Sequence, residues 1–221
     1  MSGRSFVLLG ASGLVGGHLL RELADDPGYA GGSLLSRRAL GLGTSRVREV
    51  VVDFDRPETL REHLAVADVF CCLGTTIKKA GSQEAFHKVD CDIPLAVGRE
   101  ARAAGAGQFL IVTAVGADAK SRVFYNRVKG EVEAGLAAHA FPRGLKIFRP
   151  SLIIGDRSER RPAERVAMAL MTATRPLFAG GLARYRAIEA AAIARAMRRA
   201  AIEEPAEPVR VYEGQSLFAL S

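Results

Sequence analysis

A glycine-rich turn near the N-terminus limits the folds that this chain can adopt. Residues 5–10 form a short apolar run typical of buried parallel strands, and residues 14–23 carry apolar side chains at helical spacing. Between them, Gly10 would permit a tight turn, Gly13 would let a pyrophosphate approach the backbone, and Gly16 would let the helix pack closely. This order predicts the start of a dinucleotide-binding unit, although glycines also occur in such turns for steric reasons alone.

Apolar strands and helical patterns alternate along the rest of the chain, which indicates βαβ units and a parallel sheet. The 221 residues are expected to form a single α/β domain with a doubly wound, mainly parallel sheet, the Rossmann fold. The pattern lapses over residues 151–184, which we interpret as a substrate-side insertion or lid. The predicted strands are residues 5–9, 32–35, 47–52, 69–73, 108–113, 146–148 and 209–212, and the main predicted helices are residues 14–23, 82–104, 123–138 and 187–201.

Composition excludes several classes of protein. Hydrophobic residues make up 48% of the chain and charged residues 25%, which is ordinary for a globular domain. No apolar stretch approaches the roughly 20 residues that span a bilayer, and no signal peptide is expected. Cys71 and Cys72 are adjacent on a predicted strand, so their side chains would point to opposite faces. With only three cysteines, neither a disulfide framework nor a zinc site is predicted, and a reducing cytoplasm is the expected location.

The charges and histidines do not predict a nucleic-acid or metal partner. The net charge is +7, but the 31 basic residues are spread along the chain, so we interpret most of them as solvated faces. The four histidines show no metal-ligand spacing. We therefore expect a small-molecule substrate, no nucleic acid and no metal.

The end of the second predicted strand bears on the choice of coenzyme. A fold of this type that selects NAD places an acidic residue there, on the adenosine ribose. This chain has Ser36, Arg37 and Arg38 instead. A guanidinium group matches a 2′-phosphate in shape and charge, so NADP(H) is expected to be preferred over NAD(H). The alternative is that both arginines are solvated loop charges.

Tyr125 and Lys129 are the predicted reactive pair. Four residues apart on a helix, they would lie on the same face, one turn apart. A phenol ordinarily has a pKa near 10, and a neighbouring ammonium favours the phenolate, which suits proton transfer at neutral pH. The Tyr-x-x-x-Lys spacing also occurs on helices by chance. The position of the pair after the fifth strand is what favours a catalytic role over a chance occurrence.

Several motifs together resemble a known superfamily. The G-x-x-G-x-x-G spacing and the order of later motifs resemble the atypical and extended short-chain dehydrogenases/reductases, and most closely the Tat-interacting-protein oxidoreductases and their bacterial relatives. The likeness covers nearly the whole chain. The residues that carry it are Gly10 to Gly16, Ser36 to Arg38, Cys72 to Thr76, Val115 to Asp118, Tyr125 to Glu133, and Arg149 to Ser151.

This resemblance implies a coenzyme site along the carboxyl ends of the strands. Asp53 would contact adenine, although it would serve equally as the cap of a helix near Pro57. The backbone from Cys72 onward would line the nicotinamide ribose, although an ordinary strand-end turn is the alternative. The full set of implied coenzyme-binding residues is Gly10, Ala11, Ser12, Gly13, Leu14, Gly16, Ser36, Arg37, Arg38, Asp53, Phe54, Cys72, Leu73, Gly74, Thr75, Tyr125, Lys129, Pro150 and Leu152.

The resemblance also implies a third catalytic residue, a serine or threonine at the end of the fifth strand. Thr113 is the candidate beside Tyr125 and Lys129, but Ala114 follows it where relatives usually have paired serines. A structural strand-end threonine is the alternative. Substrate is expected to enter between Thr75, Thr113, Tyr125 and residues 151–184.

The function expected from the sequence is that of an NADP(H)-dependent oxidoreductase. Hydride would move to or from a small carbonyl or alcohol substrate, with Tyr125 as the acid/base. One alternative is an NADPH-binding redox sensor or protein-interaction module without turnover, and another is a nucleotide-sugar epimerase or dehydratase. The protein is expected to be a monomer or homodimer.

Overall fold

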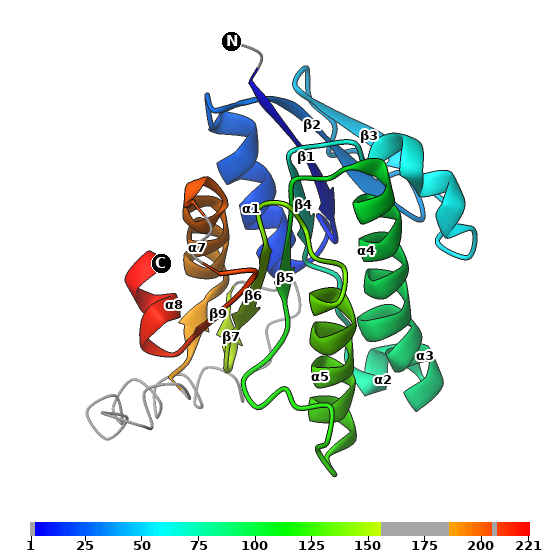
Figure 1. Ribbon diagram of the computed structural model, residues 1–221, viewed down its shortest axis with the longest axis vertical. Helices are drawn as coiled ribbons and strands as arrows, with labels where there is room; N and C mark the ends of the chain where they lie inside the picture. The colour runs from blue at the N-terminus through cyan, green and yellow to red at the C-terminus, as the bar shows by residue number, and fades with distance from the viewer. Residues whose placement is uncertain (1–2, 156–185, 205–206) are drawn as a thin grey trace.

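The computed structural model describes residues 3–155, 186–204 and 207–221. Seven strands form one sheet in the order β3-β2-β1-β4-β5-β6-β9, and every neighbouring pair is parallel (Figure 1). The predicted Rossmann-type sheet is therefore confirmed, with all of its strands. Their bounds are β1 Arg4–Leu9, β2 Tyr29–Ser36, β3 Val47–Val51, β4 Asp68–Cys71, β5 Gln108–Val112, β6 Leu145–Arg149 and β9 Val209–Glu213.

Helices cover both faces of the sheet, as Figure 1 shows. On one face lie α1 (Leu14–Asp25), α7 (Ala190–Ile202) and α8 (Gln215–Leu220). The other face is covered by the 3-10 helix η1 (Pro57–His63), α3 (Gln83–His87), α4 (Ile93–Ala104) and α5 (Phe124–Ala137). The short helix α2 spans Ile77–Ala80, and β7 (Ile153–Ile154) pairs with β8 (Ile188–Glu189) in a small second sheet.

The alternation of side chains along β1 explains why the sequence of this strand is a continuous apolar run. Phe6 and Leu8 pack into the core beneath α1 and α7, whereas Val7 and Leu9 pack into the core beneath α4 and α5. A strand buried on both faces needs apolar residues at every position. Cys71 and Cys72 divide between the two cores in the same way, and both are free thiols, as expected.

The helix predicted for residues 82–104 is confirmed, but a π-helical turn interrupts its α-helical hydrogen bonds in the middle. The π-helical turn η2 (Lys88–Asp92) separates α3 from α4, and the N–H of Ile93 donates to the carbonyl of Lys88. Pro94 follows in the first turn of α4. Since proline has no N–H, it cannot form the helical hydrogen bond back to Asp90, and the chain reorganises just before it.

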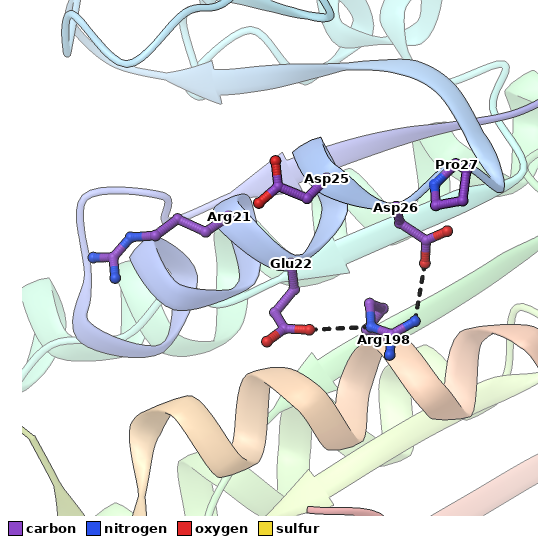
Figure 2. A pocket seen from close by; sticks show the side chains of 6 residues that line it. All are labelled: Arg21, Glu22, Asp25, Asp26, Pro27 and Arg198. Carbon is purple, nitrogen blue, oxygen red and sulfur yellow. Dashed lines mark hydrogen bonds and ion pairs between the residues drawn. The ribbon is translucent and has the colours of Figure 1, made fainter.

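Helices α1 and α7 are joined by a charged contact at the end of α1. Arg198 of α7 donates to Glu22 at 3.1 Å and to Asp26 at 3.0 Å, beside a surface hollow of about 490 Å³ (Figure 2). The glycine turn lies at the other end of this 12-residue helix, about 18 Å away at 1.5 Å per residue. The hollow is therefore separate from the predicted coenzyme site.

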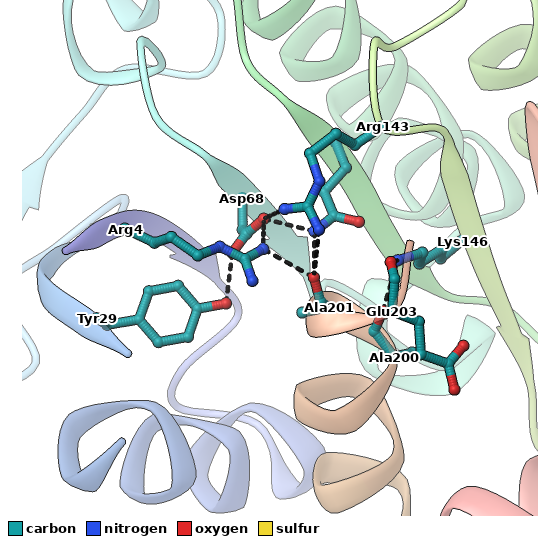
Figure 3. A network of polar contacts seen from close by, with 9 residues as sticks. Arg4, Tyr29, Asp68, Arg143, Lys146, Ala200, Ala201 and Glu203 are labelled. Carbon is teal, nitrogen blue, oxygen red and sulfur yellow. Dashed lines mark hydrogen bonds and ion pairs between the residues drawn. The ribbon is translucent and has the colours of Figure 1, made fainter. Parts of the chain in front are cut away.

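A buried polar network holds the amino end of the sheet (Figure 3). The carboxylate of Asp68 is fully buried and accepts hydrogen bonds from Arg4 at 2.6 Å, from Gln108 at 2.6 Å, and from Tyr29. Burial and the Asp68 charge raise the pKa of Tyr29 above its usual range. Arg4 and Gln108 also donate to the carbonyl of Ala201, which satisfies an acceptor at the end of α7.

Lys146 lies in the same region. Its ammonium donates to the carbonyls of Ala200 and Glu203 at the end of α7. Burial lowers the pKa of Lys146 to about 8. The end of α7 is therefore anchored by cations from three separate parts of the sheet layer: Arg4, Arg143 and Lys146.

Replacing Asp68 with alanine should lower the free energy of unfolding by about 3 kcal/mol, because it leaves the buried Tyr29 hydroxyl without an acceptor and removes the carboxylate partner of Arg4. Urea unfolding followed by circular dichroism measures the effect. The control is Asp25→Ala at the exposed end of α1, which should change stability by less than about 0.5 kcal/mol. Equal effects of the two substitutions would refute this role for the network.

Candidate functional site

The predicted site residues converge at one end of the sheet. The chain leaves β1 toward β2 on one side, whereas β4 pairs with β1 on the other. A crevice outside the carboxyl ends of the strands is expected at such a reversal of strand order. The glycine turn follows β1, residues 72–75 follow β4, and Thr113 follows β5. The fold thus brings these three segments to the same edge.

The glycine turn leaves no space for a side chain at Gly10 or Gly16. Gly10 has φ +82°, and a Cβ atom there would lie 2.5 Å from the carbonyl oxygen of Cys72. A Cβ atom on Gly16 would lie 2.1 Å from the carbonyl oxygen of Gly10. Gly13 precedes α1 without a side-chain cap, so the first N–H groups of the helix are not satisfied by a capping side chain. Ser12 and Gly13 are exposed. These features suit a phosphate group.

The predicted phosphate-selecting residues lie at the end of β2. Arg37 and Arg38 are exposed, and the Ser36 hydroxyl donates to the carbonyl of Arg38 at 2.6 Å. The loop that follows is held by Glu49 of β3, whose carboxylate accepts backbone N–H groups of residues 40–42. These bonds, led by that from Leu42, lower the pKa of Glu49.

Asp53 and Phe54 follow β3 beside this loop. Asp53 is exposed, and its carboxylate accepts the N–H of Asp55 at 2.9 Å. The alternative that Asp53 caps the helix at Pro57 is wrong, because η1 begins after Arg56 and has no side-chain cap. Phe54 is partly buried against the core beneath α4. A contact of Asp53 with adenine stays a prediction.

Lys129 is buried and paired with a residue that the sequence did not identify. Its Nζ atom donates to Asp90 Oδ1 at 2.7 Å, and the two side chains are only 6% and 1% exposed. The other oxygen of Asp90 accepts the N–H of Thr75 at 2.9 Å. Asp90 therefore joins η2, α5 and the segment after β4. The available signal was a carboxylate on the apolar face of the helical pattern, four residues after Phe86 and three before Ile93.

Tyr125 lies one turn before Lys129 and reaches the surface. Its side chain is 36% exposed, and its ring packs against Phe86 of α3 with centroids 5.7 Å apart. The Lys129 Nζ atom lies 6.0 Å from the centre of the Tyr125 ring. The two residues occupy the same face of α5, with the phenol accessible and the ammonium buried beneath it.

Thr113 is buried, and its hydroxyl has a partner inside the protein. It donates to Glu133 of α5 at 2.6 Å. Glu133 also accepts from Arg149 Nε at 3.0 Å, and this hydrogen bond raises the pKa of Arg149. Arg149 also forms an ion pair with Glu213 of β9, in which Nη1 lies 3.4 Å from Oε2. The structure thus directs the only hydroxyl of the Thr113-Ala114 pair toward a carboxylate.

The remaining predicted residues border the end of β6. Pro150 is buried, and its carbonyl accepts the N–H of Val115 at 2.9 Å. Leu152 is 51% exposed. The predicted lid, residues 151–184, lies outside the described residues from residue 156 onward. Within the described parts of the chain, no helix is both long and apolar enough to cross a membrane.

The chain is similar in sequence to two groups of curated proteins. It is 33% identical over 224 residues to protein HTATIP2 of Rattus norvegicus, which covers 100% of this chain and 90% of the relative. It is 36% identical over 167 residues to the mitochondrial protein fmp52 of Emericella nidulans, which covers 72% of this chain and 71% of the relative. No protein-family model matches the chain.

Solved structures with the same fold include nucleotide-sugar enzymes. The UDP-glucose 4-epimerase of Thermotoga maritima, solved with UDP-glucose, superposes with a TM-score of 0.69 at 15% identity, over 95% of this chain and 76% of the epimerase. MoeE5 in complex with UDP-glucose and NAD gives 0.68 at 15% identity, over 97% and 80%. At this identity the likeness concerns the fold alone.

A matched pair of glycine substitutions tests the turn. Gly16→Ala should destabilise the protein by about 1–3 kcal/mol and abolish measurable NADPH binding, because the new methyl group collides with the Gly10 carbonyl. Gly17→Ala should keep binding, since its methyl group would lie 3.4 Å from the nearest atom, the Ala11 carbonyl oxygen. Thermal unfolding and calorimetric titration measure both properties. Full binding by a folded Gly16→Ala variant would exclude this turn as the phosphate site.

Proposed function

We propose that this chain, which belongs to the family of HTATIP2 and FMP52, is an NADP(H)-dependent oxidoreductase. The family lies in the NAD(P)-binding short-chain dehydrogenase/reductase superfamily, and the sheet order of this chain agrees with that placement. A nicotinamide coenzyme is therefore the expected ligand. Its substrate is proposed to be a small carbonyl compound or alcohol.

The observation that carries this proposal is the arrangement of Tyr125 above Lys129 on α5. An accessible phenol beside a buried ammonium can exchange a proton with a substrate oxygen. The bound coenzyme supplies or accepts the hydride. In reduction, Tyr125 donates its proton to the developing alkoxide, and Lys129 stabilises the phenolate that is left. In oxidation, the phenolate removes the hydroxyl proton.

Other residues are proposed to hold the coenzyme and the substrate. The turn from Gly10 to Gly16 would hold the pyrophosphate, since its N–H groups lie at the start of α1. The segment from Cys72 to Thr75 would lie along the nicotinamide ribose. Thr113 would orient the substrate oxygen. To donate to a substrate carbonyl its hydroxyl must turn away from Glu133, whereas it can accept from a substrate hydroxyl while that hydrogen bond stays.

Binding without turnover is the second candidate function, and one observation favours it. The Thr113 hydroxyl already has a carboxylate partner, and Ala114 offers none. A protein with this arrangement could bind NADPH and respond to the redox state without chemistry. Epimerase or dehydratase activity on a nucleotide sugar has only a shared fold in its favour.

The location and assembly of the protein stay predictions. The three free thiols fit a reducing compartment, for which the cytoplasm is the expected choice. The fungal relatives are named mitochondrial, so fractionation of the source cells decides between the two. The predicted assembly, a monomer or homodimer, is measurable by light scattering.

Tyr125→Phe should lower the rate of NADPH oxidation by about 10²–10⁴-fold on any active substrate of an aldehyde and ketone panel, because it removes the proton donor. Its affinity for NADPH should stay within about twofold of the wild type, since the ring remains. The matched control is Tyr212→Phe, which removes a hydroxyl bonded to Glu203 and should keep the rate. A wild-type protein that binds NADPH tightly but converts no substrate would favour the sensor.

The coenzyme preference can be tested with paired arginine substitutions. Replacing both Arg37 and Arg38 with glutamine should weaken NADPH binding at least about tenfold and leave NADH binding unchanged, because only NADPH carries the 2′-phosphate. Arg48→Gln, on the exposed part of neighbouring β3, is the control and should change neither affinity. Equal wild-type affinities for NADPH and NADH, measured by calorimetry, would show that Arg37 and Arg38 do not select the 2′-phosphate.

A further inference from the structure

Three potential metal ligands meet between α3, η2 and α5, away from the glycine turn. They are His87 at the end of α3, Cys91 in η2 and Glu131 in α5. One ligand atom from each lies within 4.8 Å of the others. His87 and Cys91 are four residues apart, but Glu131 comes much later in the chain. Only the folded structure brings the third donor to the other two.

The spacing of the donor atoms suits a small divalent ion. Zinc binds nitrogen and oxygen ligands at about 2.0–2.1 Å, so two such ligands of a tetrahedral ion lie roughly 3.3 Å apart. His87 Nε2 and Glu131 Oε2 are 3.2 Å apart. The Cys91 thiol, on a residue that is 1% exposed, supplies the softer third donor from the protein interior.

The imidazole of His87 lies between two carboxylates, those of Asp92 and Glu131. Its other nitrogen, Nδ1, lies 3.0 Å from Asp92 Oδ1. A neutral imidazole has one N–H, and donation to Asp92 leaves the Nε2 lone pair facing the Glu131 carboxylate. Two lone pairs at 3.2 Å require either a metal ion or a second proton between them. A carboxylate that orients the other nitrogen is also the usual companion of a histidine metal ligand.

We propose that His87, Cys91 and Glu131 bind a divalent transition-metal ion of the zinc class, with Asp92 orienting His87. Binding replaces the S–H bond of Cys91 with a sulfur–metal bond, and the proton leaves to solvent. His87 and Glu131 are partly exposed, so a fourth position is open to water. The ion would join η2 to α5 one residue beyond Asp90, independently of whether Tyr125 is catalytic.

Titration of the full-length, chelator-treated protein with Co²⁺ tests this site, because cobalt bound to a thiolate has a charge-transfer absorption. We expect one Co²⁺ per chain with that band, and displacement of the cobalt by Zn²⁺. Cys91→Ser should remove the band. His87→Ala and Glu131→Gln should each weaken binding at least tenfold, and Asp92→Asn about 10–100-fold.

The controls separate a built site from surface binding. Cys71→Ser and His63→Ala, which alter the same residue types elsewhere, should keep wild-type cobalt binding. Circular dichroism establishes that each variant folds. If Cys91→Ser does not fold, Cys91→Ala takes its place. Absence of the charge-transfer band in the wild type would overturn the proposal. So would unchanged binding in folded His87→Ala and Cys91 variants, which would leave a doubly protonated His87 as the explanation of the cluster.

Discussion

The close backbone contact of Gly10 with Cys72 sets the geometry of the whole carboxyl edge of the sheet. No side chain fits at Gly10 or Gly16, so β1 can turn directly into α1 while β4 ends against that turn. The start of α1 consequently lies where the strand order reverses, next to the segment that leads from Cys72 to Thr75. A side chain at either glycine would separate these elements, and with them the two ends of the proposed coenzyme site.

The Asp90–Lys129 pair connects that edge to the face of α5 that carries Tyr125. Two nearly buried charges lose their hydration, and this cost is offset only by a close ion pair with further hydrogen bonds. The N–H of Thr75 supplies such a bond, so the segment after β4 and the helix that carries Tyr125 share one carboxylate. The π-helical turn η2 carries Asp90 in this position. A regular helix through residues 82–104 would rotate and shift Asp90 relative to α5, which gives the irregular turn a structural reason.

The central strands β1, β4 and β5 were predictable because they obey a local rule: strands buried on both faces are apolar at almost every position. Strand β2 was the least complete prediction, since it begins at Tyr29 and passes through Gly31 and Gly32, which weaken a strand pattern. The π-helical turn before Pro94 was missed because the apolar spacing on its two sides remains compatible with one regular helix. Glu49, Asp90 and Glu133 had no assigned roles because their partners are distant in the sequence or are backbone N–H groups, which the side-chain pattern does not record.

Lys129 and Thr113, the two polar residues proposed to flank Tyr125, both donate hydrogen bonds to carboxylates of the protein. These bonds limit how a substrate can interact with Thr113. Asp90 holds the Lys129 ammonium 6.0 Å from the centre of the Tyr125 ring. Glu133 holds Thr113 while it is itself fixed by Arg149, which in turn contacts Glu213 at the edge strand β9. To donate to a substrate carbonyl, the Thr113 hydroxyl must leave a hydrogen bond to a charged group, worth about 1.5–3 kcal/mol. Carbonyl reduction with Thr113 as a donor therefore requires a substrate oxygen that competes with Glu133, whereas an alcohol can donate to the Thr113 oxygen without that exchange.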